Sequence, residues 1–335
     1  MPPALYGGTE RVVSYLVEEQ VRRGHDVTLF ASGDSRTAAS LVSPLPRAIR
    51  LDDGVADPLA PHIVELSQVF DRAEEFDLIH CHVDYLAFPF SRLVSTPTLH
   101  TLHGRLDLPH LRTLLAHFDD VPLASISDAQ RRPVEDLSLA WAGTVHHGLP
   151  IEEYPIGRGE GGYLAFLGRI SPEKRPDLAI RAARRAGMPL RIAAKVDAAD
   201  RTYFAQEIEP LLSDPLVDFI GEIGDAEKPK FLGDAAALLF PIDWPEPFGL
   251  VVIEALACGT PVIARACGSV PELIVPGRTG FIADTVEELA LAASSLDRID
   301  RAACRREAEM RFSVERMADG YEAVYERLEA DAQLA

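Results

Sequence analysis

The feature that most limits the fold of this chain is a regular alternation of short apolar runs with helix-type patterns. Each apolar run is typical of a buried strand, and the segments between them repeat their apolar residues with the helical period. Such alternation favours a mainly parallel sheet covered by helices on both faces, which is a doubly wound α/β fold. The expected strands cover residues 27–31, 77–81, 98–102, 122–126, 144–146, 163–167, 190–194, 217–220, 237–241 and 262–264. Helix patterns between them include 85–93, 108–118 and 128–137, and the glycine-rich segment 276–280 is expected to be hairpin-like.

Length and composition predict two domains. A chain of 335 residues exceeds one comfortable hydrophobic core. The composition shifts to glycine, proline and charged residues over 148–162, as in a connection between domains. We therefore expect domains at 1–150 and 151–312, followed by a final helix at 313–335.

The overall charge and hydropathy exclude some classes of protein. A net charge of −19 argues against nucleic-acid binding. There is no apolar run of about 18 residues and no basic segment followed by an apolar one at the N-terminus. The sequence therefore predicts a cytoplasmic protein without a transmembrane segment.

The segment from Pro245 to Pro261 carries the densest chemical signal. Its helix pattern over 250–258 is apolar on every side, which predicts a buried helix. Glu254 lies inside that pattern, and a buried carboxylate is costly unless a partner offsets its charge. The alternative is that Glu254 faces solvent on a less buried helix.

The start of the same helix predicts a phosphate site. The backbone N–H groups of Phe248, Gly249 and Leu250 lie at its N-terminus, where hydrogen bonds and the helix dipole both favour an anion. Glu246 precedes these donors and Glu254 follows them by about two turns. Carboxylates accept hydrogen bonds from sugar hydroxyls, so the pattern describes a nucleotide sugar with its phosphates in the middle.

A second anion site is predicted at the loop after strand 163–167. This loop carries Arg169 and Lys174 and leads into a helix pattern over 176–186. In doubly wound sheets, ligands lie beyond the carboxyl ends of the strands. The loop is therefore expected to bind phosphate, and the alternative is a solvated cluster of charges.

The first half of the chain offers weaker candidates. Gly7 and Gly8 precede a helix pattern and either approach a ligand through their backbone or form a simple tight turn. His103 follows a strand, so its imidazole is expected in the cleft between domains unless it is a structural histidine. His80 and His82 share one face of a strand, but no further ligands at zinc-type spacing accompany them and no metal site is predicted.

The opening strand of the first domain is missing from the sequence pattern. Only a loop with Pro2 and Pro3 precedes the first helix pattern, whereas a parallel sheet of this kind begins with a central buried strand. We therefore expect the natural gene product to begin upstream of Met1.

These segments together resemble the retaining glycosyltransferases of family 4, which have the GT-B fold. The resemblance is strong over 161–284, through GRISPEK at 168–174 and the E-x7-E stretch at 246–254 with ACGTPV after it. It is weaker over the first domain, where it rests on Gly7-Gly8-Thr9-Glu10, His103-Gly104 and Ser127-Asp128.

The resemblance implies an architecture and a set of roles. Two doubly wound, Rossmann-like domains would face each other across a cleft, and the final helix would return to the first domain. Arg169 and Lys174 would neutralise the donor diphosphate, and Glu254 would bind the ribose hydroxyls. Glu246 and the backbone of 248–250 would hold the transferred sugar. Closure of the cleft would bring His103 and the Gly7-Gly8 loop over the donor.

The resemblance also implies an activity. The enzyme would move a hexose from a nucleoside-diphosphate sugar to a hydroxyl acceptor, which could be a sugar, a lipid-linked molecule or a small molecule. Anomeric configuration would be retained without a metal or other cofactor. The alternatives are a GT-B nucleotide-sugar epimerase, a phosphorylase, for which the sequence alone cannot show a pyridoxal-binding lysine, or a sugar-nucleotide-binding protein without catalysis.

Overall fold

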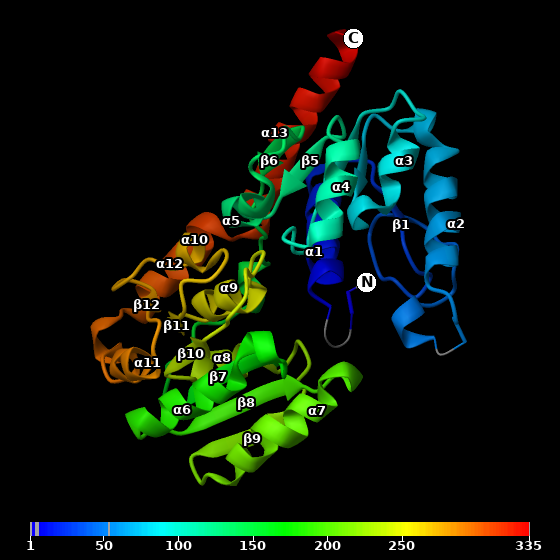
Figure 1. The fold of residues 1–335 in the computed structure, drawn as a ribbon. Coiled ribbons are helices and arrows are strands. Elements are labelled where there is room, and N and C mark those ends of the chain that lie inside the picture. The colour runs from blue at the N-terminus through cyan, green and yellow to red at the C-terminus, as the bar shows by residue number, and fades with distance from the viewer. Residues whose placement is uncertain (1, 4–6, 53, 335) are drawn as a thin grey trace. The chain divides into compact units, whose positions relative to one another are not determined.

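The computed structural model describes residues 2–3, 7–52 and 54–334, and its contacts divide the chain into two compact units. Unit 1 joins Gly7–Gly148 to the C-terminal segment Val314–Ala335. Unit 2 is the continuous stretch Leu149–Ser313. Figure 1 shows the elements of both units with their labels.

Unit 2 contains a six-stranded sheet in the order β12-β11-β10-β7-β8-β9, and every pairing in it is parallel. The strand order reverses between β7 and β10, because the chain moves outward from β7 in one direction and from β10 in the other. In open α/β sheets this reversal point is where ligands bind. The strands are β7 (Leu164–Arg169), β8 (Leu190–Lys195), β9 (Val217–Gly221), β10 (Ala237–Phe240), β11 (Val262–Ala264) and β12 (Gly280–Ile282).

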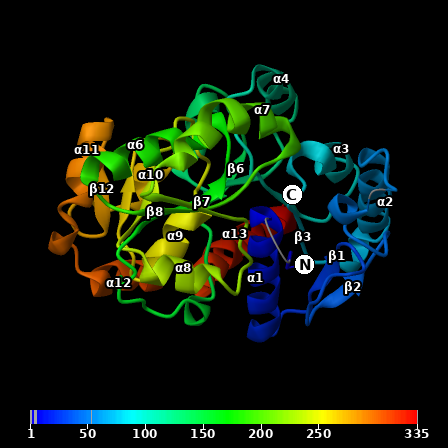
Figure 2. The ribbon, with the colours of Figure 1, turned by 90° about the horizontal axis from the view of Figure 1, so that it is seen from below.

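Helices cover the sheet of unit 2 and bury its strands. Helix α6 packs against α11, while α9 packs against both α8 and α12. Figure 2 shows α8 and α9 side by side. The central strands β10 and β11 are buried and contain no polar residue, because both faces of the sheet are covered there. The helices are α6 (Pro176–Ala186), α7 (Arg201–Tyr203), α8 (Lys228–Asp234), α9 (Leu250–Ala257), α10 (Val270–Leu273), α11 (Val286–Ala293) and α12 (Arg301–Arg311).

Unit 1 contains two separate parallel sheets. One has the order β3-β4-β5-β6, and the other is the pair β1-β2. In the order 3-2-1-4 of doubly wound sheets, the first strand of the chain would lie between β1 and β3. Within the ranges that the structure describes, no strand occupies this place. The strands are β1 (Thr28–Phe30), β2 (Ser40–Val42), β3 (Ile79–Cys81), β4 (Thr98–Thr101), β5 (Leu123–Ser125) and β6 (Trp141–Thr144).

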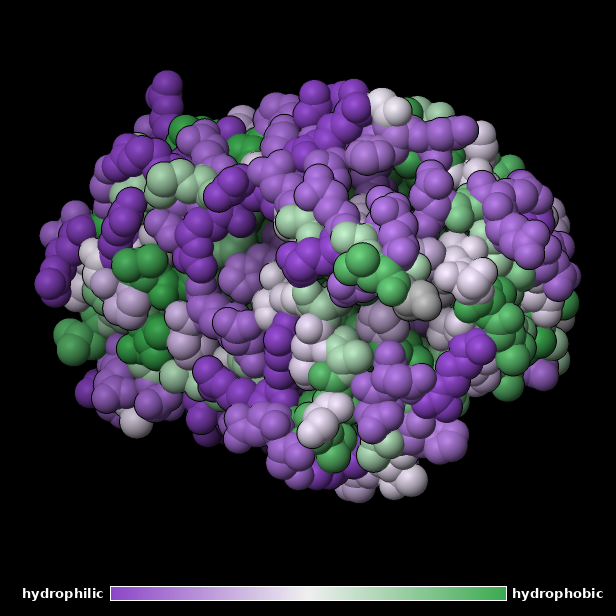
Figure 3. Space-filling view, turned by 90° about the horizontal axis from the view of Figure 1, so that it is seen from above, coloured by the Kyte–Doolittle hydropathy of each residue, from purple (hydrophilic) through white to green (hydrophobic). Residues whose placement is uncertain are grey.

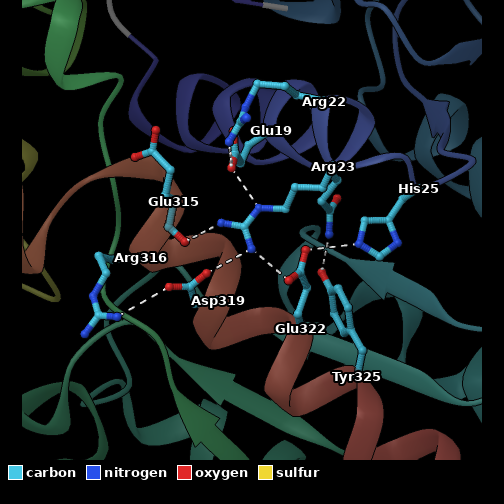
Figure 4. Close-up of polar contacts among 10 residues, drawn as sticks. Glu19, Arg22, Arg23, His25, Glu315, Arg316, Asp319, Glu322 and Tyr325 are labelled. Atoms are coloured by element: carbon cyan, nitrogen blue, oxygen red, sulfur yellow. Dashed lines mark hydrogen bonds and ion pairs between the residues drawn. The ribbon is translucent and has the colours of Figure 1, made fainter.

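The last helix of the chain, α13 (Val314–Leu334), is part of unit 1 and packs against its first helix, α1 (Gly8–Arg23). Arg23 of α1 pairs with Asp319 at 2.9 Å and with Glu322 at 2.8 Å (Figure 4). Gln20 of α1 donates to the hydroxyl of Tyr325 at 3.0 Å. The remaining helices of unit 1 are α2 (Leu59–Phe70), α3 (Phe88–Ser91), α4 (Pro109–His117) and α5 (Asp128–Arg131).

Several elements differ from the sequence-based expectations. The glycine-rich turn at 276–280 does not connect a hairpin, because β12 runs parallel to β11. The helix expected at 128–137 is a short α5 followed by a 3-10 turn at Arg132–Val134, since Pro133 lacks the N–H that a continuing helix needs. The last strand of unit 1 lies at 141–144 instead of 144–146, and β2 and α2 were not expected from the pattern.

Hydrophilic side chains cover most of the face in Figure 3, and hydrophobic ones form separate groups on it. Across residues 2–3, 7–52 and 54–334, no helix combines the length and the apolar character needed to cross a bilayer.

Candidate functional site

The candidate site of unit 2 lies at the carboxyl ends of β7 and β10, where the strand order reverses. Strand β7 ends at Arg169, and the loop after it carries Lys174. Strand β10 ends at Phe240, and the loop after it leads to α9. The two loops are joined because the N–H of Asp243 donates to the carbonyl of Glu173 at 2.8 Å. The sheet topology thus brings two segments about 70 residues apart to one edge.

Lys174 and Glu246 are in direct contact. The ammonium group of Lys174 forms an ion pair with Oε2 of Glu246, and the two side chains are only 17% and 12% exposed. The indole N–H of Trp244 donates to the same carboxylate oxygen at 2.9 Å. The ammonium also lies 4.9 Å from the Trp244 ring and 5.6 Å from the Phe240 ring, within the range of cation–π attraction. Two of the predicted site residues are therefore held together by a third that the sequence analysis did not identify.

Arg169 is surrounded by carboxylates. Its guanidinium donates to Glu173 at 2.6 Å and lies 3.7 Å from Asp197 and 3.8 Å from Asp200. The side chain is one-third exposed, so these pairs are partly screened by water. An anion that approaches Arg169 competes with acids that already surround it.

Glycines shape the loop before α9. Gly249 is the N-cap residue with φ 92°, a left-handed conformation that a side chain disfavours, and no side chain caps the helix there. A Cβ on Gly268 would lie 2.3 Å from the carbonyl oxygen of Glu246, so only glycine allows this approach. The next residue, Ser269, donates two hydrogen bonds to this segment. Its N–H donates to the Glu246 carbonyl at 3.0 Å, and its hydroxyl donates to the Phe248 carbonyl. The loop after β11 therefore packs against the backbone of the predicted sugar-binding segment and holds it by hydrogen bonds.

Glu254 has the partner that its burial requires. It is 3% exposed, and Lys228 of α8 reaches its Oε1 at 3.1 Å. The hydroxyl of Tyr154 donates to the same oxygen at 3.5 Å. Lys228 also pairs with Asp225 at 3.1 Å, so it is shared between two acids. The sequence-based expectation of a buried, paired carboxylate on α9 agrees with this geometry.

In unit 1, His103 lies beside His82 and His147 in the segments that follow β4, β3 and β6; His147 is buried, and the other two are half-buried. Nε2 of His103 is 3.0 Å from Nδ1 of His82, so one imidazole donates to the other. Its ring stacks on His147 with centroids 5.3 Å apart. Burial lowers the pKa of His103 to about 4, which keeps the imidazole neutral near pH 7. Within the described residues, no group of three or more His, Cys, Asp or Glu side chains is arranged to hold a metal ion.

Asp84 fixes the backbone of His103. Its carboxylate accepts the N–H of His103 at 3.3 Å. Asp84 has φ 49°, which is uncommon for a residue other than glycine and indicates local strain. From the other side, the amide of Gln130 donates to the carbonyls of Leu102 at 2.9 Å and Gly104 at 2.8 Å. The turn that carries His103 is thus held at both ends.

Gly7 and Gly8 form the start of α1. Gly8 is the first residue of the helix, Gly7 is its N-cap with no side-chain hydrogen bond, and the Gly7 carbonyl accepts the N–H of Arg11 at 3.2 Å. The fold therefore places this pair at a helix N-terminus, as the sequence predicts. Both belong to unit 1, with His103, while the other seven candidate residues belong to unit 2.

Comparison with known proteins identifies the family of both halves. The description "Glycosyltransferase Family 4" matches residues 6–147, and "Glycosyl transferases group 1" matches residues 157–310. The chain is a member of glycosyltransferase family 4. The predicted family is thereby confirmed.

One relative and two solved structures illustrate what this family 4 glycosyltransferase is similar to. The D-inositol 3-phosphate glycosyltransferase of Mycolicibacterium smegmatis is 26% identical over 97% of this chain and 87% of its own length. Sucrose-phosphate synthase of Thermosynechococcus elongatus has a TM-score of 0.78 at 18% identity, over 97% of this chain and 94% of that one. HepE of Anabaena, solved with UDP-glucose, has a TM-score of 0.73 at 18% identity, over 98% of this chain and 97% of that one. These structures confirm the GT-B fold with two Rossmann-like domains.

Some residues of this glycosyltransferase site were missed from the sequence. Trp244 lies two residues before Glu246, and an aromatic residue beside an acid in a loop gives no distinct pattern. Lys228 begins a short helix that the sequence analysis did not describe. Asp84 shows no signal at all, because its left-handed backbone is visible only in the structure.

Proposed function

We propose that this family 4 enzyme transfers a hexose from a nucleoside-diphosphate sugar to a hydroxyl acceptor with retention of anomeric configuration. The observation that carries the proposal is the ion pair between Lys174 and Glu246 at the strand reversal point of unit 2. Lys174 lies in the loop that follows Arg169 at the end of β7, and Glu246 lies in the loop that leads to the N-terminus of α9. Cations and a helix N-terminus suit a diphosphate, and carboxylates beside them suit sugar hydroxyls.

Each residue of unit 2 has a proposed role in this reaction. Negative charge grows on the diphosphate as the bond to the sugar breaks, and Arg169 and Lys174 are assigned to stabilise it. Glu246 and the backbone of 248–250 hold the transferred sugar. Glu254 accepts hydrogen bonds from the ribose, and the ion pair with Lys228 holds its carboxylate in place.

In unit 1, His103 is assigned a catalytic role and Gly7 with Gly8 a binding role. Nε2 of His103 is engaged with His82, whereas Nδ1 has no hydrogen-bond partner among the described residues and suits hydrogen bonding to a sugar hydroxyl. Its contacts with His82 and Asp84 fix the ring and the backbone that carry these groups. Pre-positioned hydrogen-bonding groups lower the cost of reorganisation during reaction.

The reaction is proposed to need no metal ion, because fixed cations and backbone dipoles are available for the leaving diphosphate. The acceptor carries a hydroxyl nucleophile, and inositol phosphates are the first acceptors to test because a relative of this chain is named for one. UDP-sugars lead the donor panel because the HepE structure contains UDP-glucose.

A two-step experiment tests the proposal. Thermal shift with UDP-glucose, UDP-galactose, UDP-N-acetylglucosamine, GDP-mannose and ADP-glucose identifies the donor, since a ligand that binds only the folded state raises the melting temperature. The selected donor is then incubated with D-inositol 3-phosphate and other hydroxyl acceptors, and proton NMR reads the anomeric configuration of the product. An α-linked donor should give an α-linked product in the presence of EDTA. An inverted product, or activity that EDTA abolishes, would contradict the mechanism.

A second outcome would favour an alternative enzyme. An epimerase would convert the bound nucleotide sugar without an acceptor and a phosphorylase would require inorganic phosphate, so both reactions are included as assays. Binding of a donor with no turnover in any of them would support a sugar-nucleotide-binding protein.

A further inference from the structure

The contacts around Lys174 raise a question about how a diphosphate reaches it. The ammonium group is already paired with Glu246 and lies over the rings of Trp244 and Phe240. An ion pair that is less than one-fifth exposed is poorly screened by water. A diphosphate that approaches Lys174 therefore competes with Glu246 for the charge of the ammonium group.

Replacement of that contact would leave Glu246 without its cation. A mostly buried carboxylate that loses its partner carries a large desolvation penalty. Here the indole N–H of Trp244 still donates to Oε2 of Glu246 at 2.9 Å, so the acid keeps one charge-assisted hydrogen bond. Oε2 of Glu246 bonds to both Lys174 and Trp244. The hydrogen bond from Trp244 therefore also fixes the direction of Oε1.

Trp244 is well anchored for this role. Its carbonyl accepts the N–H of Glu246 at 2.8 Å, which ties the two residues into one tight turn. The preceding residue, Asp243, is held by Arg175 at 3.0 Å and by Arg265 at 2.8 Å. The backbone that carries the indole is therefore held independently of the partner that Lys174 takes.

We propose that Trp244 is a positioning residue of the donor site, which holds Glu246 in place while Lys174 exchanges this carboxylate for the donor diphosphate. The inference rests on the proposed function, because it assumes that unit 2 binds a nucleoside diphosphate. It adds an exchange of ion pairs as the first step of binding, and it makes Glu246 a competitor of the diphosphate before it becomes a ligand of the sugar.

The exchange makes opposite predictions for two substitutions. Glu246→Gln removes the competing charge, so Lys174 binds UDP or GDP more tightly, by roughly tenfold in Kd. Trp244→Phe keeps an aromatic ring beneath Lys174 but removes the indole N–H. Glu246 then depends on Lys174 alone, so diphosphate affinity falls, by about tenfold for one hydrogen bond to a charged group. A simple contact role for Glu246 would instead leave the affinity for UDP or GDP unchanged, since neither ligand contains the transferred sugar.

Calorimetry with UDP and with GDP measures both effects on the full chain. Intrinsic fluorescence gives an independent readout, because the chain contains only two tryptophans, Trp141 and Trp244. The variant Trp141→Phe leaves Trp244 as the single reporter and serves as the matched control, since Trp141 lies in β6 of unit 1 beside Arg131. Its Trp244 emission should change on addition of the nucleotide, with the Kd found by calorimetry.

The possible results separate the inference from the proposed function. If the wild-type chain binds neither UDP nor GDP, nor any donor of the panel, the proposed function is wrong. If the wild type binds but Glu246→Gln does not bind more tightly, the ion-pair exchange is refuted. Unchanged affinity in Trp244→Phe, or a Trp244 emission that does not respond to a bound nucleotide, overturns the positioning role. Should Trp244→Phe fail to fold, Glu246→Gln and the fluorescence titration still decide the question.

Discussion

We expect His100→Leu to stabilise unit 1, although it removes a fully buried core residue. His100 lies in the middle of β4 with 0% exposure, and in the described part of the chain neither ring nitrogen has a hydrogen-bond partner. Its ring contacts Phe88 edge-on at 4.9 Å. A buried polar group without a partner costs about 1–3 kcal/mol, so leucine, which has no polar atom, should raise the free energy of unfolding near pH 7.5 by about that amount.

The gain should grow as the pH falls. Burial lowers the pKa of His100 from 6.5 to about 3. The unfolded chain therefore takes up the proton first, and the stability that is present above pH 6.5 is lost as the pH falls toward 3. Each pH unit in this window costs about 1.4 kcal/mol for one histidine, so the advantage of leucine should increase by about 2 kcal/mol between pH 7.5 and pH 5.

Urea denaturation at pH 7.5 and pH 5 measures this directly. In a Trp244→Phe background, Trp141 is the only tryptophan and reports on unit 1 alone. Replacement of the exposed His117 by Gln is the control. It should change the free energy of unfolding by no more than about 0.5 kcal/mol at either pH. The reasoning is refuted if His100→Leu lowers the stability at pH 7.5, or if its effect is the same at both pH values.

Three further predictions concern unit 2. Arg169→Ala should lower kcat more than it raises the donor KM, by on the order of 3 kcal/mol in transition-state stabilisation, and a change in KM alone would show that Arg169 holds only the ground state. Glu254→Gln should weaken nucleoside-diphosphate binding by about 1.5–3 kcal/mol in calorimetry. An unchanged Kd would show that Glu254 does not bind the ribose. Arg175 has φ 53°, a backbone conformation that only glycine adopts without strain. Arg175→Ala and Arg175→Gly both lose the ion pairs with Asp177 and Asp243, so the alanine variant should melt about 2–4 °C below the glycine variant. Equal melting temperatures would contradict the last expectation.

Much of the fold was predictable because its strands are buried on both faces. A strand such as β10 has no polar residue to obscure its apolar run, and the loops at its ends are marked by proline and glycine. The short edge pair β1-β2 gave a weaker signal, and β2 is largely exposed. Strand directions were misread at 276–280, because a glycine-rich turn has the same composition whether the next strand pairs in parallel or antiparallel fashion.

The candidate site was predictable as a set of residues but not as a set of contacts. The sequence predicted a partner for Glu254 from the cost of burying a charge, yet the choice of Lys228 depends on how α8 packs against α9. Lys174 and Glu246 were assigned to separate parts of the ligand, whereas the structure pairs them directly. Spacing along the chain carries no information about such pairs when two different strands of the sheet bring them together.

The placement of α13 in unit 1 has a consequence for synthesis of the protein. Tyr321 and Tyr325 of this helix reach the polar groups of the first sheet, where Tyr325 lies 2.8 Å from His80 and Tyr321 lies 3.2 Å from Thr101. The ribosome makes the sheet first and the helix only after the whole of 149–313, a delay on the order of 10 s at typical rates of translation. During that delay the later unit is being made, while the earlier one still exposes the surface that α13 will cover. Chaperone binding to the nascent chain is therefore expected at the sheet of unit 1.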